Sequence, residues 1–554
     1  AHPFIADARR QLRRAAEQSL ADFPGAPVTA AEFDDMIATA LIERAMQVVG
    51  RTMILELNVA RVTGALEGKD SAERFISFAR QCADPKRAME IFQEYPVMAR
   101  QLARTCRQWA ETGAELFDRL CRDWGRIETT FFGGDAPRKL IETSIGAGDT
   151  HRGGRTVAVL KFEDGRKLVY KPRSLAVDRA FGRMLSWVNG KRFPAPFRPL
   201  HVIDRGEYGW TEFVARADCE DAAAARRFYV RQGGVLALMH ALCGNDLHEE
   251  NLIAAGEQPV LIDLETLFVA PFPANEAEAI DARAGRIAGT SVVRVGLLPS
   301  PGANGGLDLS GLGSTENRLT PHPMLVLDND GTDEMRMERR RVKMEGSDNV
   351  PAVGGAKMHA ADYKDAILEG FETMYRLLAT HRDECLAADG PLANFRGAEV
   401  RIVLRGTQTY GRMLQESHHP DLLRDALERD RFFDRLWVDV KYRPDLERVI
   451  VSERKEMEEG DIPCFVADAA SRDLVGGSGI RFPDFFDKSG MQFVRERIAG
   501  MGEEDLRRQT WFIRAAMAGP DAPTAPLPSA GVKSTDAEGR FTAAAADVGD
   551  RLAK

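Results

Sequence analysis

The chain has few of the features that mark disulfide-rich, zinc-binding or membrane-spanning proteins. Its 554 residues include only seven cysteines, which are scattered, odd in number and never arranged as C-x-x-C. This pattern argues against a disulfide framework and a tetrahedral zinc cluster, so no zinc is expected. It favours reduced, mostly buried thiols in a cytoplasmic protein.

Long apolar runs are also missing. No uninterrupted run approaches the roughly 20 residues of a membrane span, and the start AHPFIADARRQLRR has no apolar signal core. The start has no Met either, so we expect a processed or tagged chain, or an excised piece. A formal net charge of −9 argues against a broad nucleic-acid surface. The expected partners therefore include neither nucleic acid nor a membrane.

The most informative stretch is DLHEENLI, followed ten residues later by LIDLE. Asp246 and Asn251 stand five apart, and Asp263 lies twelve residues beyond the Asn. A kinase catalytic loop needs one carboxylate to orient or deprotonate a hydroxyl, an amide oxygen on the metal, and a later aspartate on the same magnesium. The apolar run Pro259–Ile262 predicts a buried strand that delivers Asp263 to a nucleotide cleft. The spacing alone is a weak signal, because chance supplies it often.

Elements before this loop favour a bilobal kinase-like α/β (α+β) fold. Residues 1–135 show helical periodicity, with Thr29 capping a helix that begins at Ala30 and Glu32 at the capping-box position. Strands are expected at 156–162 and 167–171 around the turn at 163–165, and another before Trp210. Helices are expected at 177–188 and 226–242. We assign 136–216 to an N-lobe and 217–300 to a C-lobe with the catalytic and metal loops.

Three further groups of residues are candidates for the site. Lys171 closes a strand where a kinase lysine reaches ATP phosphates, although a strand-end lysine is ordinarily solvated. His248 could stabilise the transferring phosphate or relay a proton, or simply pack in its loop. The glycine-rich GDTHRGG, residues 148–154, suits backbone amides near phosphate, and Asp149 and His151 add ionisable groups that a plain turn does not need.

A second concentration of charge lies in VRIVLRGTQTY, residues 400–410, which is expected to be a strand. Arg401 and Arg405 are four apart and would share a face whether the segment is strand or helix. Two guanidiniums on one face can hold a phosphate bidentately. The alternative is an exposed edge strand with solvated arginines. Glu453 lies in a charge run, and most such residues are solvated.

Together these segments resemble the dehydratase portion of class II lanthipeptide synthetases, the LanM family. The resemblance spans roughly residues 145–467 and rests on GDTHRGGRTVAVLKFEDGRKLVYKPRSL, YGWTEFV, FYVRQGGVLALMHALCGNDLHEENLI, PVLIDLETLF, VRIVLRGTQTYGRML and GDIPCF. The family looks like a lipid kinase with an added activity. It phosphorylates Ser and Thr of a ribosomally made precursor peptide and then eliminates phosphate to give dehydroalanine and dehydrobutyrine.

The resemblance implies roles for the candidate residues. Those assigned to phosphorylation with ATP and Mg²⁺ are Lys171, Asp246, His248, Asn251 and Asp263, with Asn251 and Asp263 as the Mg²⁺ ligands. Lys171, Gly148 and Glu212 are placed among the nucleotide-binding residues. Arg401 and Thr407 match the elimination pair, Arg405 lies in the same motif, and Glu453 aligns approximately with a glutamate of that activity. Asp149 and His151 match a G-D-x-H element whose step is left open, as is the general base.

One departure from the family pattern concerns the C-terminal side. Family members continue into a zinc-dependent cyclase, and this sequence has no Cys-His-Gly element. We expect residues 301–510 to be an elimination and helical region. Residues 511–554 are expected to be a linker and the start of a missing cyclase, either removed or replaced by a separate enzyme. The alternatives to a dehydratase acting on a precursor peptide with its leader are a kinase that stops at phosphorylation of a peptide, lipid or small alcohol, and a non-catalytic leader-binding scaffold.

Overall fold

Helices occupy the chain up to Phe132, as the periodicity predicts. The computed structural model describes residues 2–518 except 136, 147, 271–286, 288, 301–306, 315 and 317, so the predicted linker and C-terminal helix lie outside the described residues. The expected capping box is confirmed: Thr29 and Glu32 bind each other's backbone N–H at the start of the second helix. The helices are α1 (His2–Asp22), α2 (Ala30–Val62), α3 (Ser71–Ala83), α4 (Pro85–Glu94) and α5 (Pro96–Phe132).

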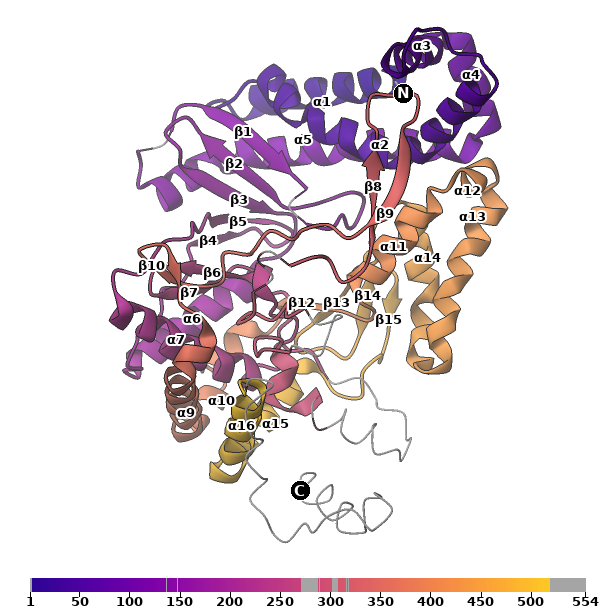
Figure 1. Cartoon of the computed structure of the whole chain (residues 1–554). Helices are drawn as coiled ribbons and strands as arrows, with labels where there is room; N and C mark the ends of the chain where they lie inside the picture. Colours follow the sequence, from indigo (N-terminus) through magenta and orange to yellow (C-terminus); the bar gives the residue numbers. More distant parts are fainter. Residues whose placement is uncertain are drawn as a thin grey trace, which may run out of the picture.

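An antiparallel five-stranded sheet follows, with strand order β1-β2-β3-β5-β4. Its strands are β1 (Leu140–Ile145), β2 (Ala158–Phe162), β3 (Lys167–Lys171), β4 (Val202–Asp204) and β5 (Gly209–Glu212). The predicted β2–β3 hairpin is confirmed, with Gly165 at φ 85° in its turn. Helices α1, α2 and α5 cover one face of the sheet and share a core with it (Figure 1). Helix α6 (Ala176–Gly190) connects β3 to β4.

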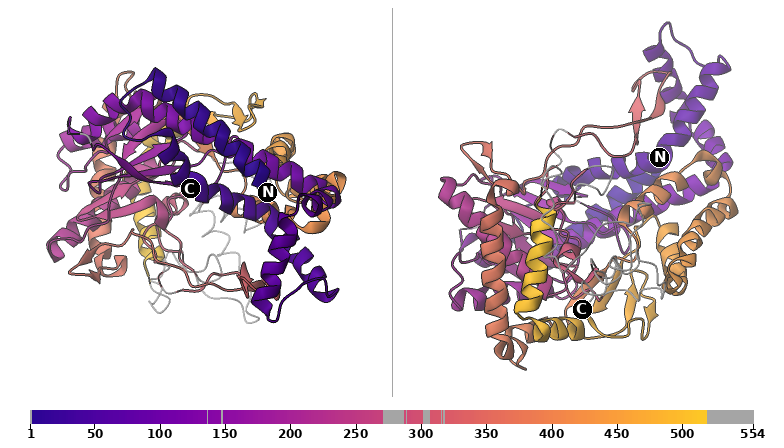
Figure 2. Two further views of the ribbon diagram at one scale, coloured as in Figure 1. Left: turned by 90° about the horizontal axis from the view of Figure 1, so that it is seen from above. Right: turned by 60° about the horizontal axis from the view of Figure 1, so that its bottom comes forward.

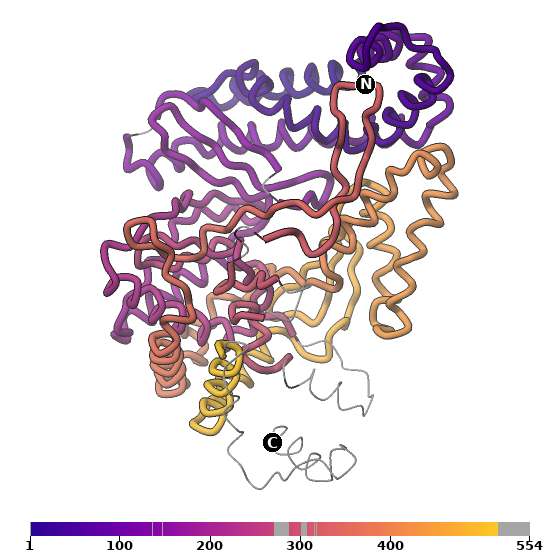
Figure 3. Tube along the Cα trace, in the orientation of Figure 1, coloured from indigo at the N-terminus to yellow at the C-terminus, as the bar shows by residue number. Residues whose placement is uncertain are grey.

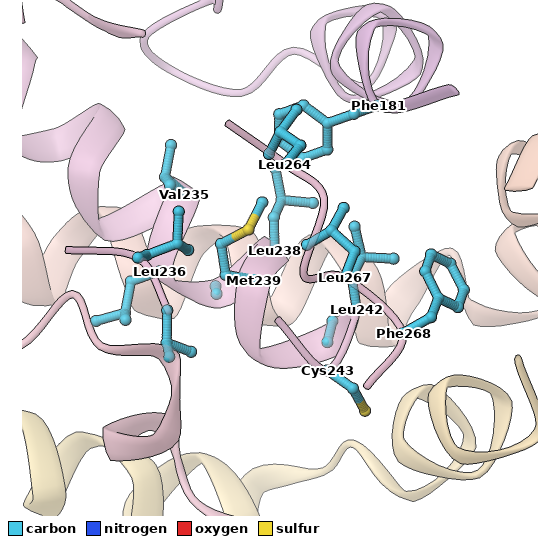
Figure 4. Close-up of a cluster of buried hydrophobic side chains, with 14 of the residues drawn as sticks. Phe181, Val235, Leu236, Leu238, Met239, Leu242, Cys243, Leu264, Leu267 and Phe268 are labelled. Carbon is cyan, nitrogen blue, oxygen red and sulfur yellow. The ribbon is translucent and has the colours of Figure 1, made fainter. Parts of the chain in front are cut away.

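A second apolar core surrounds α7 (Ala222–Ala241), which is buried on almost every face. Figure 4 shows Leu238 and Met239 of α7, with Leu242 just after it, near Leu264, Leu267 and Phe268 in this core. Helix α7 lies against α9 (Lys364–Thr380), and Gly233 and Gly370 allow the two backbones to touch. This core fixes the position of the catalytic loop, because the loop leaves directly from the end of α7.

The catalytic loop runs through a short 3₁₀ turn, η1 (Glu249–Asn251), into the hairpin of β6 (Leu252–Ala255) and β7 (Gln258–Leu261). The strand predicted at Pro259–Ile262 is therefore confirmed as β7, which we call the metal strand after its predicted role, and Asp263 lies just past its end. A four-stranded antiparallel sheet lies further along, in the order β12 (Glu399–Ile402), β13 (Phe465–Asp468), β14 (Leu474–Gly476) and β15 (Arg481–Phe482).

The prediction of one strand over residues 400–410 is wrong in its second half. Strand β12 ends at Ile402, and helix α11 (Thr407–Ser417) begins at Thr407. The apolar run continues in the sequence to Leu404, but β13 pairs only with residues 399–402. Without a partner strand the segment turns, and Gly406 precedes the helix as its N-cap.

The remaining elements surround these cores. A two-stranded ribbon of β8 (Met324–Asp328) and β9 (Arg336–Arg340) projects toward α2 and α3, as the tube in Figure 3 shows. Figure 2 shows α9 and α16 side by side on the face opposite the first helices. The other elements are η2 (Val292–Val295), β10 (Ala352–Val353), β11 (Ala356–Lys357), η4 (Ala360–Tyr363), α10 (Arg382–Leu386), η5 (Pro391–Phe395), α12 (Pro420–Arg424), α13 (Ala426–Phe432), η6 (Phe433–Lys441), η7 (Pro444–Val449), α14 (Ile450–Glu458), α15 (Gly490–Gly500) and α16 (Glu503–Ala516).

The predicted mixed α+β fold is confirmed, with the helices segregated from small antiparallel sheets. The predicted division into five domains stays a prediction. Within the part of the chain that the structure describes, no helix is both long and apolar enough to cross a bilayer.

The contact between α7 and α9 yields a first prediction. A Cβ at Gly233 would lie 2.0 Å from the backbone oxygen of Ile367, so Gly233→Ala must push the helices apart. We expect a loss of about 2 kcal/mol or more in the free energy of unfolding, measured by denaturant titration. Gly125→Ala in α5 is the matched control, since a Cβ there meets nothing within 4 Å. That variant should gain stability through helix propensity. Equal stability of Gly233→Ala and wild type would contradict the packing argument.

Candidate functional site

The catalytic loop holds Asp246 in a backbone conformation that is rare outside glycine. Its φ is 62°, and its N–H donates a hydrogen bond to the side-chain oxygen of Asn245 at 2.8 Å. Left-handed backbone at a non-glycine residue costs of order 1 kcal/mol and is often found where a side chain is aimed for function. The carboxylate of Asp246 remains exposed to solvent, where a hydroxyl substrate can reach it.

Asn251 is oriented with its amide nitrogen toward the protein. Its Nδ2 donates to the backbone oxygen of Asp246 at 2.9 Å, which leaves Oδ1 as an available ligand atom. Asp263 supplies a carboxylate from the adjacent strand end. Mg²⁺ is usually held by one or two such oxygens together with phosphates and water, so this pair fits the ion. Among the described residues no three His, Cys, Asp or Glu side chains are grouped closely enough to hold a metal.

Lys171 is buried at the end of β3. Its Nζ lies 4.0 Å from Oδ1 of Asp178 on α6 and donates to the backbone oxygen of Ile262, next to Asp263. The solvated alternative for Lys171 is therefore wrong. Its ammonium group lies beside the metal strand, where it can meet a phosphate.

Arg173 joins three carboxylates, and sequence reasoning missed it. Its guanidinium lies 3.0 Å from Asp178, 2.8 Å from Asp263 and 3.3 Å from Glu265. Burial opposes ionisation of Arg173, but the three carboxylates outweigh it and raise its pKa. Burial likewise acts to raise the pKa of Asp263, but Arg173 and Lys171 outweigh burial and lower that pKa below its usual range. Both groups therefore stay ionised at neutral pH.

Glu265 connects this cluster to Arg401, and it too was missed. One of its carboxylate oxygens lies 2.5 Å from the guanidinium of Arg401, and its backbone oxygen accepts from the backbone N–H of Arg401 at 2.6 Å. Burial acts to lower the pKa of Arg401, but Glu265 is the main influence that raises it. A signal was present in the sequence, because Glu265 follows Asp263 by only two residues.

His151 lies within electrostatic reach of Arg401. Burial and the Arg401 charge lower its pKa to about 4, so its imidazole is neutral at pH 7. Its Nδ1 lies 2.7 Å from the backbone oxygen of Ile462 and donates to it, which leaves Nε2 as an acceptor. The glycine-rich loop thus brings an uncharged histidine toward Arg401.

Asp246 belongs to the same electrostatic neighbourhood. Partial desolvation raises its pKa, His248 and Arg401 act to lower it, and the charges of Glu265 and Asp263 raise it further. His248 caps η1 through Nδ1, which accepts from Glu250 N–H at 3.4 Å. Residues from the catalytic loop, the metal strand and β12 therefore lie around one site.

Arg405 and Glu453 form a separate buried set. Arg405 Nε donates to Glu453 at 2.8 Å, its other nitrogens meet Asp439 and the backbone oxygen of Leu436, and Tyr410 donates to Glu453 at 2.5 Å. The solvated alternative for Glu453 is wrong, since its side chain is fully buried and burial raises its pKa. Arg401 and Arg405 therefore bind different carboxylates. Thr407 is the first residue of α11.

Two residues predicted to bind the nucleotide, Glu212 and Gly148, bind other parts of the chain in the structure. Glu212 at the end of β5 accepts from Arg198 at 2.7 Å and from the backbone N–H of His201 at 2.8 Å. Gly148, at φ 121°, accepts a 3.4 Å bond from the hydroxyl of Thr156. Their assignment to the nucleotide stays a prediction.

Glu456 on α14 is a further buried carboxyl near the site, and sequence reasoning missed it. Its two oxygens accept from Cys464 N–H at 2.9 Å and from the Ser452 hydroxyl at 3.0 Å. Burial is the main cause that raises its pKa to about 7. Only its place in the fold reveals it, because its sequence context is an ordinary charge run.

Comparison with known proteins places the chain in a family. Residues 95–468 match the family described as "Domain of unknown function (DUF4135)", and the chain belongs to that family. The matched range contains every ion pair of the cluster around Arg173 and Arg401.

A characterised relative adds a functional link. The chain is 26% identical over 418 residues to the lacticin 481/lactococcin biosynthesis protein LcnDR2 of Lactococcus lactis subsp. lactis. The similarity covers 71% of this chain and 43% of that protein, so the chain spans less than half of its relative's length.

Glu456 yields a prediction about pH. An acid whose pKa is higher in the folded than in the unfolded chain stabilises the fold below its unfolded value of about 4.5, and this stabilisation is lost as pH rises through about 7. Between pH 5 and pH 8, wild type should therefore lose roughly 2–3 kcal/mol more in unfolding free energy than Glu456→Gln. Parallel pH profiles of the two proteins, measured by chemical denaturation, would show that Glu456 has no raised pKa.

Proposed function

We propose that this chain is a lanthipeptide dehydratase, which uses ATP and Mg²⁺ to phosphorylate Ser and Thr of a precursor peptide and then eliminates the phosphate. One observation carries the proposal: Arg401 is linked through Glu265 and Arg173 to Asp263. A phosphate transferred near Asp263 would be formed beside the cation that can help it leave. The printed role of the relative in lacticin 481 and lactococcin biosynthesis supports the choice of a peptide substrate.

In the proposed phosphorylation, Asp246 orients the substrate hydroxyl and accepts its proton. Bound Mg²⁺ and ATP supply the phosphoryl group and its charge neutralisation. Asn251 and Asp263 would hold the metal through their oxygens, and Lys171 would contact phosphate from the end of β3. His248 lies two residues beyond Asp246 and is available to stabilise the transferring group.

In the proposed elimination, a base removes the Cα proton, the Cα–Cβ double bond forms, the Cβ–O bond breaks and inorganic phosphate leaves. Arg401 stabilises the growing charge of the leaving phosphate. His151 is neutral, so its Nε2 can accept the Cα proton. A phosphate dianion bound to Arg401 would offset the charge that lowers the pKa of His151, which makes the imidazole a stronger base when the phosphopeptide is present.

If the first proposed reaction is phosphoryl transfer, Asp263→Asn should abolish modification of the precursor peptide. The substitution keeps the shape but removes the charge that the metal needs, so we expect at least about a hundredfold loss of phosphorylation. In the assay, the protein is incubated with ATP, Mg²⁺ and the precursor peptide encoded next to its gene. The mass of the intact peptide is then measured. Asp328→Asn on β8, where the carboxylate only pairs with Arg336, is the control and should keep activity. A fully dehydrated peptide from Asp263→Asn would refute the proposed role of Asp263 in phosphorylation.

The elimination half predicts that Arg401→Ala releases phosphopeptide. Without the guanidinium the leaving phosphate loses its cation, so each modified site should gain about 80 Da instead of losing water. Arg412→Ala, an exposed arginine on α11, is the matched control and should dehydrate normally. If wild type itself leaves stable phosphate, the chain is a kinase that stops at phosphorylation. Normal dehydration by Arg401→Ala would show that Arg401 has no part in elimination.

A further inference from the structure

The loop that carries His151 is held by two consecutive residues from a distant part of the chain. Arg152, Gly153 and Gly154 all have positive φ, of 49°, 87° and 82°. Such a run turns successive N–H groups toward one side, an arrangement that commonly binds an anion. Here the anion is internal: the buried carboxylate of Asp461 accepts from Gly153 N–H at 2.5 Å and from Gly154 N–H at 2.9 Å.

Ile462 completes the attachment through its backbone. Its N–H donates to the backbone oxygen of Thr150 at 3.0 Å, and its own oxygen accepts from Nδ1 of His151 at 2.7 Å. The first contact fixes the loop beside His151, and the second fixes the ring and its tautomer. A carbonyl acceptor at Nδ1 forces the proton onto that nitrogen and leaves Nε2 unprotonated.

The segment that provides these contacts is itself fixed from two sides. Gln101 and Gln108 of α5 donate to the backbone oxygens of Glu458 and Glu459 at 3.2 Å each, at the C-terminal end of α14. Three residues beyond Ile462, strand β13 begins and pairs with β12, where Val466 lies opposite Arg401. One short stretch of chain therefore holds the His151 loop at one end and lies against the arginine strand at the other.

We propose that Asp461 is a positioning residue for elimination, which sets the distance and orientation of His151 relative to Arg401 by holding the 150–154 loop. The inference rests on the proposed function. Asp461 touches neither the metal strand nor the catalytic loop, so its loss should leave phosphoryl transfer intact. If Asp461 has this role, the N–H groups of Gly153 and Gly154 bind this internal carboxylate. The GDTHRGG segment then binds nucleotide phosphate with other atoms or does not bind it.

The test compares Asp461→Asn with wild type in two assays. Asn can accept from one N–H with its oxygen but presents its own NH₂ to the other, so the loop is released on one side. In the first assay, with ATP, Mg²⁺ and precursor peptide, ADP formation should stay within about threefold of wild type while phosphopeptide accumulates. In the second, the purified phosphopeptide from Arg401→Ala is the substrate, and kcat for phosphate release should fall about tenfold or more. KM should be unchanged, because Arg401 still binds the phosphate.

Asp468→Asn is the matched control. That carboxylate also accepts from a backbone N–H, that of Ala470 at 2.7 Å, but this bond is local to the end of β13. It should behave as wild type in both assays. If Asp461→Asn does not fold, Gly153→Ala is the second variant, because a side chain at φ 87° strains the same loop without a clash.

The outcomes separate the possibilities. Normal elimination by folded Asp461→Asn overturns the positioning role, and so does an equal loss of both steps in parallel with thermal stability. A fall in kcat for elimination alone supports it. If wild type yields neither phosphopeptide nor dehydrated peptide, the proposed function itself has failed and the inference falls with it.

Discussion

The site depends on the guanidinium of Arg173. Asp178, Asp263 and Glu265 would repel one another if they shared a small, partly buried space without a cation between them. Arg173 holds them apart by fixed contacts of 2.8–3.3 Å. Because Glu265 also binds Arg401, the same arginine indirectly sets how far β12 lies from the metal strand. Lys171 and Arg401 therefore belong to one electrostatic unit, although 230 residues separate them in the sequence.

Local spacing accounts for what the sequence predicted correctly. Asp246, Asn251 and Asp263 lie on one loop and hairpin, so their proximity follows from short-range geometry alone. The capping box at Thr29 and the turn at Gly165 were predictable for the same reason. Glu265 could have been found as well, since it lies only two residues beyond Asp263. The sequence therefore carried most of the residues that lie around Asp263, although not Arg173.

Long-range pairing accounts for what the sequence could not give. Arg405 resembles a second phosphate ligand until Glu453, 48 residues away, is seen to bind it. Strands β13 to β15 contain two to four residues each, too few for a periodicity signal to emerge. Asp461 is 308 residues from Gly153, and although it lies in the matched segment GDIPCF, its sequence does not reveal that partner.

Helix α5 has a mechanical consequence. Its 37 residues make a rod of roughly 55 Å. Near one end Asp123 accepts from the buried indole of Trp210 on β5, and near the other Gln101 and Gln108 bind the C-terminal end of α14. Hinge opening of the kind common between kinase lobes would have to bend this rod or break one set of anchors. Small molecules would therefore enter and leave the site through movement of its loops. The distance between the five-stranded sheet and α14 would stay constant.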